Sequence, residues 1–537
     1  MRTVLHGLWI ISALGVAASA VVGCQASCSD SDSCGPYLPP SAGSGNHSGE
    51  GDAGASGEAG GANGGNAGAG TTGGSGGRGG SGGNAGSGAG AAGDSGAGGG
   101  GACDLSQDPS SESCLVDEDH AVFVAPNGKD SAAGTKRAPL ATLSKAIELA
   151  AGSKLVLVCD GTFDEHVTIA SGARIYGGFK CADWSPEDGA PLFKPSSPGP
   201  ALKVDAVTEP LLFTRLNFEV GDATSVGETA LTALVNASPS VTFDSVTLKA
   251  GKGKAGAAGT LTPFTFPDAS SLNGNPETTA GVGGASKTCG CQASLSTTGG
   301  LGGAPVAGGQ NGSKGFPDLG GGLGGDPLAA DCSAGSGGKK GANAPATASG
   351  NGATNPGSAS TSGWSPASGA DGASGSPGQG GGGGASLNAS GHGGGGGCGG
   401  CGGNGATAGK GGGASIALLL LNSSVLLQAS TLTTSDAGDG GSGHVGQIGQ
   451  LDSGAGGGVA SSFNSCPGGN GGKGGDGGAS GGGAGGISVG IVWQGSTAPM
   501  LTDTTTITGK AGAAGSGGLP GSNDGVAGLK QELLQVQ

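Results

Sequence analysis

Apolar residues fall in short blocks, and long stretches between these blocks contain almost none. Four blocks share a six-residue frame of apolar and polar positions: 213–218, 243–248, 427–432 and 502–507. A single apolar residue lies two positions before the start of each frame: Leu211, Val241, Val425 or Met500. Further upstream of each lies an apolar strand: 202–204, 231–235, 416–421 or 487–493. Such a recurring unit predicts stacked β-coils, because one coil cannot bury its own apolar side and stacking makes a continuous core. Four unrelated strand pairs in a β-sandwich are the alternative.

Glycine-rich inserts interrupt this repeat at 251–412 and 436–485, and both leave from the same place in the unit. This placement is typical of loops on one corner of a solenoid. The chain has 131 glycines and only 3% aromatic residues. Glycine-rich segments gain too little from burial to offset the entropy of ordering them, so one globular domain is expected.

The domain's first part has a different pattern. Residues 121–124 predict a strand, and Pro126-Asn127-Gly128 predicts a turn. A helix is expected to begin at Pro139 and to end before Gly152, because its apolar residues share one face. These apolar residues are Leu140, Leu143, Ile147 and Ala150. Strands at 155–158, 167–169 and 174–178 follow.

The order of these elements resembles a known bacterial family. The spaced motifs are 124–130 (VAPNGKD), Gly134-Thr135, 138–143 (APLATL) and 160–165 (DGTFDE). Together they resemble the uncharacterised domain that opens many right-handed parallel β-helix proteins of the pectin-lyase-like superfamily. The resemblance implies an all-β, right-handed parallel β-helix with an N-terminal capping helix. It implies no particular reaction, since the family has none in common.

The N-terminus predicts export. Met1-Arg2 is followed by an uncharged apolar segment that ends in Val21-Val22-Gly23-Cys24. This resembles a bacterial lipoprotein signal, in which the cysteine is acylated, so Cys24 is the predicted lipidation site. Gln25, rather than Asp, favours the outer membrane by resemblance to enterobacterial sorting. An ordinary signal peptide with Cys24 in a disulfide is the alternative.

The cysteines are expected to form disulfides, because thirteen minus the acylated Cys24 leaves an even number in an oxidising compartment. Candidate pairs are Cys28 with Cys34, Cys103 with Cys114, and Cys159 with Cys181. The last pair lies about one coil apart, and neighbouring coils lie within the distance a disulfide accepts, at about 4.8 Å.

Cys398 and Cys401 have the CxxC spacing of redox or zinc sites, but their glycine-run context favours a disulfide in a loop. Cys289, Cys291, Cys332 and Cys466 are left to pair among themselves or with Cys398 and Cys401. No metal site and no cofactor are predicted.

Candidate acids for carbohydrate chemistry are scattered along the coils. They are Asp160, Asp164, Glu165, Glu219, Asp222, Asp244 and Asp503. Arg215 and Lys203 are the basic candidates of the early coils. Polysaccharide cleavage needs grouped ionisable residues on one rigid face, so no catalytic residue is predicted and an enzyme is disfavoured. The net charge of −16, without a basic cluster, argues against a nucleic-acid partner.

The segment 468–478 repeats glycine with a period of three, which suits polyglycine-II-like helices packed side by side. It also resembles the glycine-rich repeats of PGRS-type surface proteins. A flexible loop is the favoured interpretation.

These observations predict a lipid-anchored structural or adhesive surface protein. A polysaccharide-binding or polysaccharide-cleaving β-helix is the alternative, and membrane lipid and surface polysaccharide are the expected partners. The expected order is a signal peptide (1–23), a tether (24–102), a cap with first coils (103–250), an insert (251–412), a coil (413–435), an insert (436–485), a coil (486–510) and a tail (511–537).

Overall fold

The computed structural model describes residues 103–277, 282–328, 331–458 and 464–537. All of them belong to one compact unit, Gly96–Gln537. The predicted signal peptide, Cys24, the tether up to residue 102 and the Cys28–Cys34 pair lie outside the described residues.

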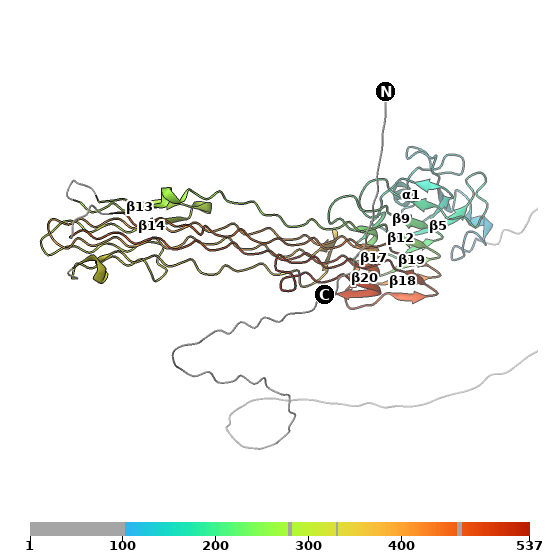
Figure 1. Ribbon diagram of the computed structural model, residues 1–537. Coiled ribbons are helices and arrows are strands. Elements are labelled where there is room, and N and C mark those ends of the chain that lie inside the picture. Colours follow the sequence, from blue (N-terminus) through green and yellow to red (C-terminus); the bar gives the residue numbers. More distant parts are fainter. Residues whose placement is uncertain (1–102, 278–281, 329–330, 459–463) are drawn as a thin grey trace, which may run out of the picture. The chain divides into compact units, whose positions relative to one another are not determined.

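Three parallel sheets, each made of strands from successive coils, form the domain that carries the apolar blocks (Figure 1). The first sheet contains β1 (Ala121–Val124), β2 (Leu155–Cys159), β5 (Ala173–Phe179), β8 (Leu211–Thr214), β11 (Val241–Asp244), β18 (Val425–Gln428) and β21 (Met500–Thr502). The second contains β4 (Val167–Ile169), β7 (Leu202–Asp205), β10 (Ala230–Asn236), β17 (Ser415–Leu421), β20 (Ser488–Gln494) and β23 (Lys530–Val536). The third contains β3 (Thr162–Phe163), β6 (Leu192–Phe193), β9 (Asn217–Glu219), β12 (Thr247–Lys249), β19 (Thr431–Thr433) and β22 (Thr505–Ile507). From β2 onward, successive coils each add one strand to every sheet, which confirms the parallel β-helix.

The remaining elements are short. The helix α1 spans Leu143–Ala150, and the two antiparallel hairpins are β13 (Lys287–Gly290) with β14 (Ser296–Gly299) and β15 (Gly357–Ser360) with β16 (Gly363–Pro366). Single helical turns lie at Ser113–Leu115, Ala269–Leu272, Gln292–Ser294 and Cys332–Ser336.

Equivalent residues of successive coils stack inside the β-helix. Phe213 pairs in register with Phe243, and their rings are stacked with centroids 4.9 Å apart. Phe193 and Phe218 stack likewise at 5.2 Å in the third sheet. Because the coils repeat the same inward positions, each coil buries the apolar surface of the one before it.

The corner between the first and third sheets repeats a left-handed backbone conformation. It falls at Arg215, Ser245, Ala429 and Asp503, with φ between 46° and 55°. The N–H of Arg215 donates to Asp244 of the next coil, and the N–H of Ser245 donates to Gln428. This shared corner explains why the six-residue frame recurs.

The fourth predicted frame is wrong by one residue. Leu427 pairs with Leu501, not with Thr502, and Leu432 pairs with Thr506, not with Ile507. Met500 and Ile507 are both exposed, because this coil ends the first and third sheets. An uncovered coil no longer needs strict inward alternation, so the apolar pattern does not fix its register.

The predicted capping helix is present but begins later than Pro139. Thr142 is its N-cap and accepts the N–H of Lys145, while Leu140 forms a bridge with Val124. Leu143 and Ile147 belong to the same buried cluster as the first coils. The helix therefore closes the apolar end of the β-helix, as its amphipathic pattern requires.

The two inserts are not flexible loops. Segments 367–385, 394–412 and 466–486 run side by side, and each forms hydrogen bonds with the other two at every third residue. For example, Gly381 donates to Gly397, Gly397 donates to Gly469, and Gly469 donates to Gly382. This period of three is that of a polyglycine-II-like helix. The preference for a flexible loop was wrong because the backbone itself supplies the bonds that apolar side chains do not.

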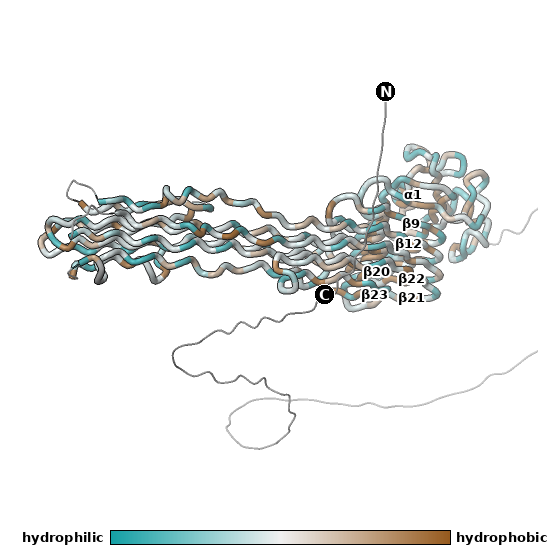
Figure 2. Tube along the Cα trace, in the orientation of Figure 1, coloured by the Kyte–Doolittle hydropathy of each residue, from teal (hydrophilic) through white to brown (hydrophobic). Residues whose placement is uncertain are grey.

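Glycine is required by the close approach of these chains. A Cβ atom added at Gly381 would lie 2.0 Å from the carbonyl oxygen of Gly469. The segments run away from the coils as a bundle (Figure 1), and their hydropathy is mixed and pale beside the apolar coils (Figure 2). We call 251–412, 436–486 and 509–528 together the glycine bundle.

The predicted tail, 511–537, is also a structural element. Gly512, Gly515 and Gly518 donate backbone hydrogen bonds to 480–486 in the bundle, and β23 pairs with β20 over Ser488–Gln494. Because this segment has few apolar residues, the pattern of apolar positions did not predict that it forms part of the structure. Among the described residues, no helix has the length and apolarity that a membrane crossing requires.

Candidate functional site

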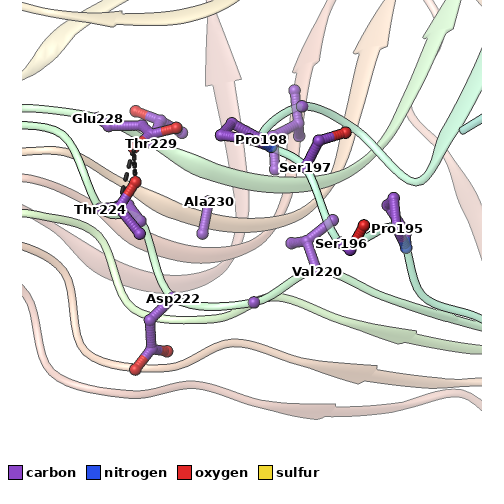
Figure 3. A pocket seen from close by; sticks show the side chains of 14 residues that line it. Pro195, Ser196, Ser197, Pro198, Val220, Asp222, Thr224, Glu228, Thr229 and Ala230 are labelled. Carbon is purple, nitrogen blue, oxygen red and sulfur yellow. Dashed lines mark hydrogen bonds between the residues drawn. The ribbon is translucent and has the colours of Figure 1, made fainter. Parts of the chain in front are cut away.

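A groove lies between turns of the β-helix beside the start of β10 (Figure 3). One half, about 260 Å³, is formed by the turn after β6, the turn after β9 and the start of β10. The other half, about 320 Å³, continues to the β15–β16 hairpin. The two halves share Pro198, Gly199, Glu228, Thr229 and Leu231. We call this combined cavity the corner groove.

Glu228 holds a loop within the groove. Its carboxylate accepts the N–H groups of Thr224 and Ser225 at 2.8 and 2.7 Å. The hydrogen bond from the Ser225 N–H, foremost among the causes, lowers the pKa of Glu228. A carboxylate held ionised in this way is not available to donate a proton.

Asp222 is the other acid that lines the groove, and its carboxylate accepts the N–H of Lys252 at 2.7 Å. In Figure 3 its side chain points away from Glu228. The two acids therefore serve separate backbone groups and form no acid–base pair.

His166 fixes the wall formed by 195–200. Its Nδ1 lies 2.8 Å from the carbonyl oxygen of Pro200, and its Nε2 lies 2.8 Å from the Ser197 hydroxyl. A carbonyl only accepts, so Nδ1 carries the proton, and in the neutral ring Nε2 accepts from Ser197. This arrangement leaves the imidazole engaged on both sides.

Trp364, on strand β16 of the hairpin, lines the second half of the groove, and only 7% of its surface is exposed. Its ring packs with Leu231 and other apolar residues on the outer face of the second sheet. The buried indole Nε1 has no hydrogen-bond partner among the described residues. A buried N–H without a partner costs free energy, so this indole N–H is a polar group that the described residues leave without a partner beside the groove. The sequence reasoning missed Trp364, which stands alone in a glycine-rich insert.

The candidate acids of the sequence do not come together. Glu165 accepts the N–H groups of Leu143 and Ser144 at 2.8 and 3.0 Å, so it caps helix α1. Asp164 accepts the N–H of Ser196, and Asp160 accepts that of Gly161. Asp244 accepts the Ser245 hydroxyl. Asp503 lies at the exposed corner of the last coil.

Of these acids, Glu219 is the one that forms ion pairs. It forms ion pairs with Lys194 at 2.9 Å and Lys249 at 3.3 Å. Partial burial acts to raise its pKa, but the hydrogen bonds from Lys194 and Lys249 outweigh burial and lower the pKa of Glu219. The cluster spans three coils of the third sheet and ties them together.

The basic candidates are structural as well. Arg215 donates two hydrogen bonds to Asp108, and its Nε donates to Gly177. Lys203 lies 3.5 Å from Asp205. In the described part of the chain, no group of three or more His, Cys, Asp or Glu residues could hold a metal ion.

Five disulfides join the cysteines of the described residues. Cys103–Cys114 and Cys159–Cys181 are two of the three pairs that the sequence favoured, and the latter joins neighbouring coils with a Cα separation of 4.9 Å. The partners of Cys398 and Cys401, which the sequence left open, lie on another segment of the bundle. Cys398 pairs with Cys289, Cys401 pairs with Cys291, and Cys332 pairs with Cys466. In an extended chain of period three, Cys398 and Cys401 point the same way toward a neighbouring chain, so each bonds across to it.

Comparison with known proteins gives one family match. Residues 126–177 match the family model described as "Protein of unknown function (DUF1565)", a domain known to begin parallel β-helix proteins. No curated protein matches the chain. Among solved structures, a GH136 lacto-N-biosidase from Eubacterium ramulus is similar, with 17% identity and a TM-score of 0.19. The similarity covers 25% of this chain and 27% of that one.

Proposed function

We propose that this protein is a lipid-anchored structural or adhesive protein of the cell surface, in which the β-helix carries the glycine bundle outward. The observation that carries the proposal is the bundle's backbone bonding. Chains 367–385, 394–412 and 466–486 bond to one another over most of their length. A bundle bonded in this way holds its far end at a fixed distance, whereas a flexible coil would not.

Several described segments of the bundle meet at its end far from the coils (Figure 1). Gln310 and Ser386 exchange backbone hydrogen bonds, Leu387 donates to Asn464, and Cys332 is bonded to Cys466. Leu328, four residues before Cys332, is 90% exposed. Exposed apolar residues at a supported tip suit contact with another surface. We call Gln310, Leu328, Cys332, 386–387 and 464–466 together the tip.

An adhesion assay tests this role. Cells that display Leu328→Asp are expected to adhere less than cells with the native chain. Leu323→Asp changes an exposed leucine elsewhere in the bundle (52% exposed) and is expected to leave adhesion unchanged. Equal adhesion of all three strains, with equal surface amounts, would argue against a tip-mediated adhesive role.

The anchor needs its own test. Metabolic labelling with a fatty-acid analogue is expected to modify the chain at Cys24, and Cys24→Ser is expected to remove the label and block normal processing. A fully processed, unlabelled native chain would remove the lipid anchor from the proposal and leave the bundle's role to be tested separately.

Glycan binding at the corner groove is the second candidate function, and the unpartnered Nε1 of Trp364 favours it. Trp364→Phe keeps an aromatic ring but removes the N–H donor. We expect a glycan array to show signals that Trp364→Phe loses and that Trp493→Phe, on strand β20, retains. An array without signals for the native chain would eliminate this candidate.

A further inference from the structure

A second groove lies on the glycine bundle itself, with a volume of about 520 Å³. Its floor is 473–479, and its two walls are 343–349 and 445–451. Each wall is bonded to the floor chain: Ala344 donates to Lys473 on one side, and Gly477 donates to Gln447 on the other. We call this cavity the bundle groove.

One wall exposes a row of large apolar side chains. Val445, Ile448 and Leu451 are 53%, 65% and 59% exposed. They recur at every third residue, so in a helix with three residues per turn they point to one side. Leu519 lines the same groove and is also exposed. A continuous exposed apolar row of this kind is typical of an interaction surface.

The chain's own 511–528 hairpin fills the continuation of this groove nearer the coils. The segment that forms the floor continues toward the coils through Ser480, Gly483 and Gly486. The carbonyl groups of these three residues accept the N–H groups of Gly518, Gly515 and Gly512 of the hairpin, respectively. The segment that forms the apolar wall bonds to the hairpin in the same way. Its N–H groups at Ala437, Gly440 and Gly443 donate to the carbonyl oxygens of Lys510, Ala513 and Ser516, respectively. The hairpin then turns back at 519–522, where the open groove begins.

The spacing of the wall's glycines continues into the open part. On the wall, the glycines that follow Gly443 at the same spacing are Gly446 and Gly449. The Gly449 N–H donates to the side chain of Asp476 at 2.9 Å, so a floor carboxylate stands where a neighbouring chain's carbonyl would lie. The groove therefore has the bonding geometry of a position in the bundle that lacks its chain.

We propose that the bundle groove binds an extended glycine-rich polypeptide segment from another molecule, with glycine at every third residue. The requirement for glycine follows from the hairpin: a Cβ atom at Gly515 would lie 2.0 Å from the carbonyl oxygen of Gly441. From Val445 to Leu451 the groove accommodates about 19 Å of chain, at ~3.1 Å per residue. The bound segment would cover the row formed by Val445, Ile448 and Leu451.

The test uses the full-length protein and a fluorescent 18-residue probe that repeats residues 511–519 (AGAAGSGGL) twice. We expect saturable binding by anisotropy. A second probe, with alanine in place of the glycines that correspond to 512, 515 and 518, is expected to bind at least tenfold more weakly. Absence of saturable binding up to ~1 mM of the first probe, or equal binding of the two probes, would overturn the proposal.

Two protein variants place the binding site. Ile448→Asp is expected to weaken binding at least tenfold, while Leu323→Asp, an exposed leucine of the bundle outside this groove, leaves it unchanged. Lengthening the hairpin by six glycine-rich residues after Gly518 is expected to fill the groove and abolish probe binding. Retained binding by both Ile448→Asp and the lengthened hairpin would contradict the assigned site.

Size-exclusion chromatography with light scattering distinguishes a different occupant. A concentration-dependent dimer that Ile448→Asp abolishes, together with no probe binding, would identify the surface of a second copy as the partner. That outcome would replace the extended segment proposed above.

Discussion

Arg215 and Asp108 form a bidentate ion pair, with N–O distances of 2.7 and 2.9 Å. Arg215 lies at the left-handed corner after β8, and Asp108 lies in the lead-in that precedes the first strand. The pair thus fastens the lead-in, with its Cys103–Cys114 disulfide, to the side of the coils. Arg215 is therefore one of the residues that joins separate parts of the domain.

This ion pair predicts an acid-dependent loss of stability. Partial burial acts to raise the pKa of Asp108, but hydrogen bonds, above all from Arg215, outweigh it and lower that pKa. A lowered folded-state pKa stabilises the protein above the unfolded-state value, near 3.9, and this stability is lost as pH falls through the folded-state value. Asp108→Asn is expected to cost about 1 kcal/mol at neutral pH. The difference between variant and native chain in denaturant unfolding should shrink below about pH 4; a difference that is constant with pH would contradict this account.

Glycine at the closest approaches of the bundle is expected to resist substitution. Gly381→Ala would place a Cβ atom 2.0 Å from the Gly469 carbonyl oxygen, whereas Gly290→Ala would meet nothing within 4 Å. We expect Gly381→Ala to destabilise the bundle by about 1–3 kcal/mol or more, as overpacking does. Hydrogen exchange of the amides of 367–385, 394–412 and 466–486 measures the effect. Equal protection in Gly381→Ala and the Gly290→Ala control would argue against close backbone packing.

The disulfides of the bundle predict a defined set of cross-linked peptides. Digestion without reduction is expected to join peptides that contain Cys289 or Cys291 to those that contain Cys398 or Cys401. Each of these bonds closes a loop of more than a hundred residues, because the separations are 109 and 110. Removing one such pair as Cys291→Ser with Cys401→Ser should cost about 2–5 kcal/mol. A peptide with an internal Cys398–Cys401 bond would contradict the structure.

Glu165 provides a test that separates folding from carbohydrate chemistry. Because its carboxylate caps helix α1, Glu165→Ala is expected to destabilise the domain by about 1 kcal/mol, as loss of a cap does. Any glycan signal of the native chain should be unchanged per folded molecule, since Glu165 is not among the residues that line the corner groove. Thermal unfolding and the glycan array measure the two effects. Loss of glycan binding without loss of stability would assign Glu165 a role in binding instead.

The coils were predictable because they obey the rule of inward apolar positions. Phe213, Phe243 and Leu427 recur at equivalent places, and the structure stacks them in register. The rule failed at Leu501, where no further coil of that sheet covers the surface. Where burial no longer selects a face, the sequence pattern does not fix the register.

The bundle was harder to predict for a different reason. Its stabilising groups are backbone N–H and C=O groups, which every residue carries, so residues as alike as Gly381 and Gly397 do not reveal that they are neighbours. The period of three in 468–478 is shared by an ordered bundle and by a flexible coil. The pairing of Cys398 with Cys289 depends on which chains lie side by side, and it was unpredictable for the same reason.

Deletion of 252–411 tests whether the coils, which bury apolar residues, fold independently of the glycine bundle, which is held by backbone hydrogen bonds. The Ser415 hydroxyl donates to the Gly251 carbonyl oxygen at 2.7 Å, so the two retained ends lie close together and a short connection can close the gap. No residue of the deleted segment belongs to the main buried cluster of the coils, so the β-helix is expected to remain folded. The second insert, in contrast, loses partners: Gly454 donates to Cys398, and Gly475 donates to Ser376. Limited proteolysis should therefore cut 436–486 rapidly while the coils resist.

Deletion of 241–248 removes β11 and part of β12. This deletion should unfold the domain, and circular dichroism would detect the loss of β structure. An unfolded 252–411 deletion, or a protected 436–486 within it, would show that the coils and the bundle do not fold on these separate grounds.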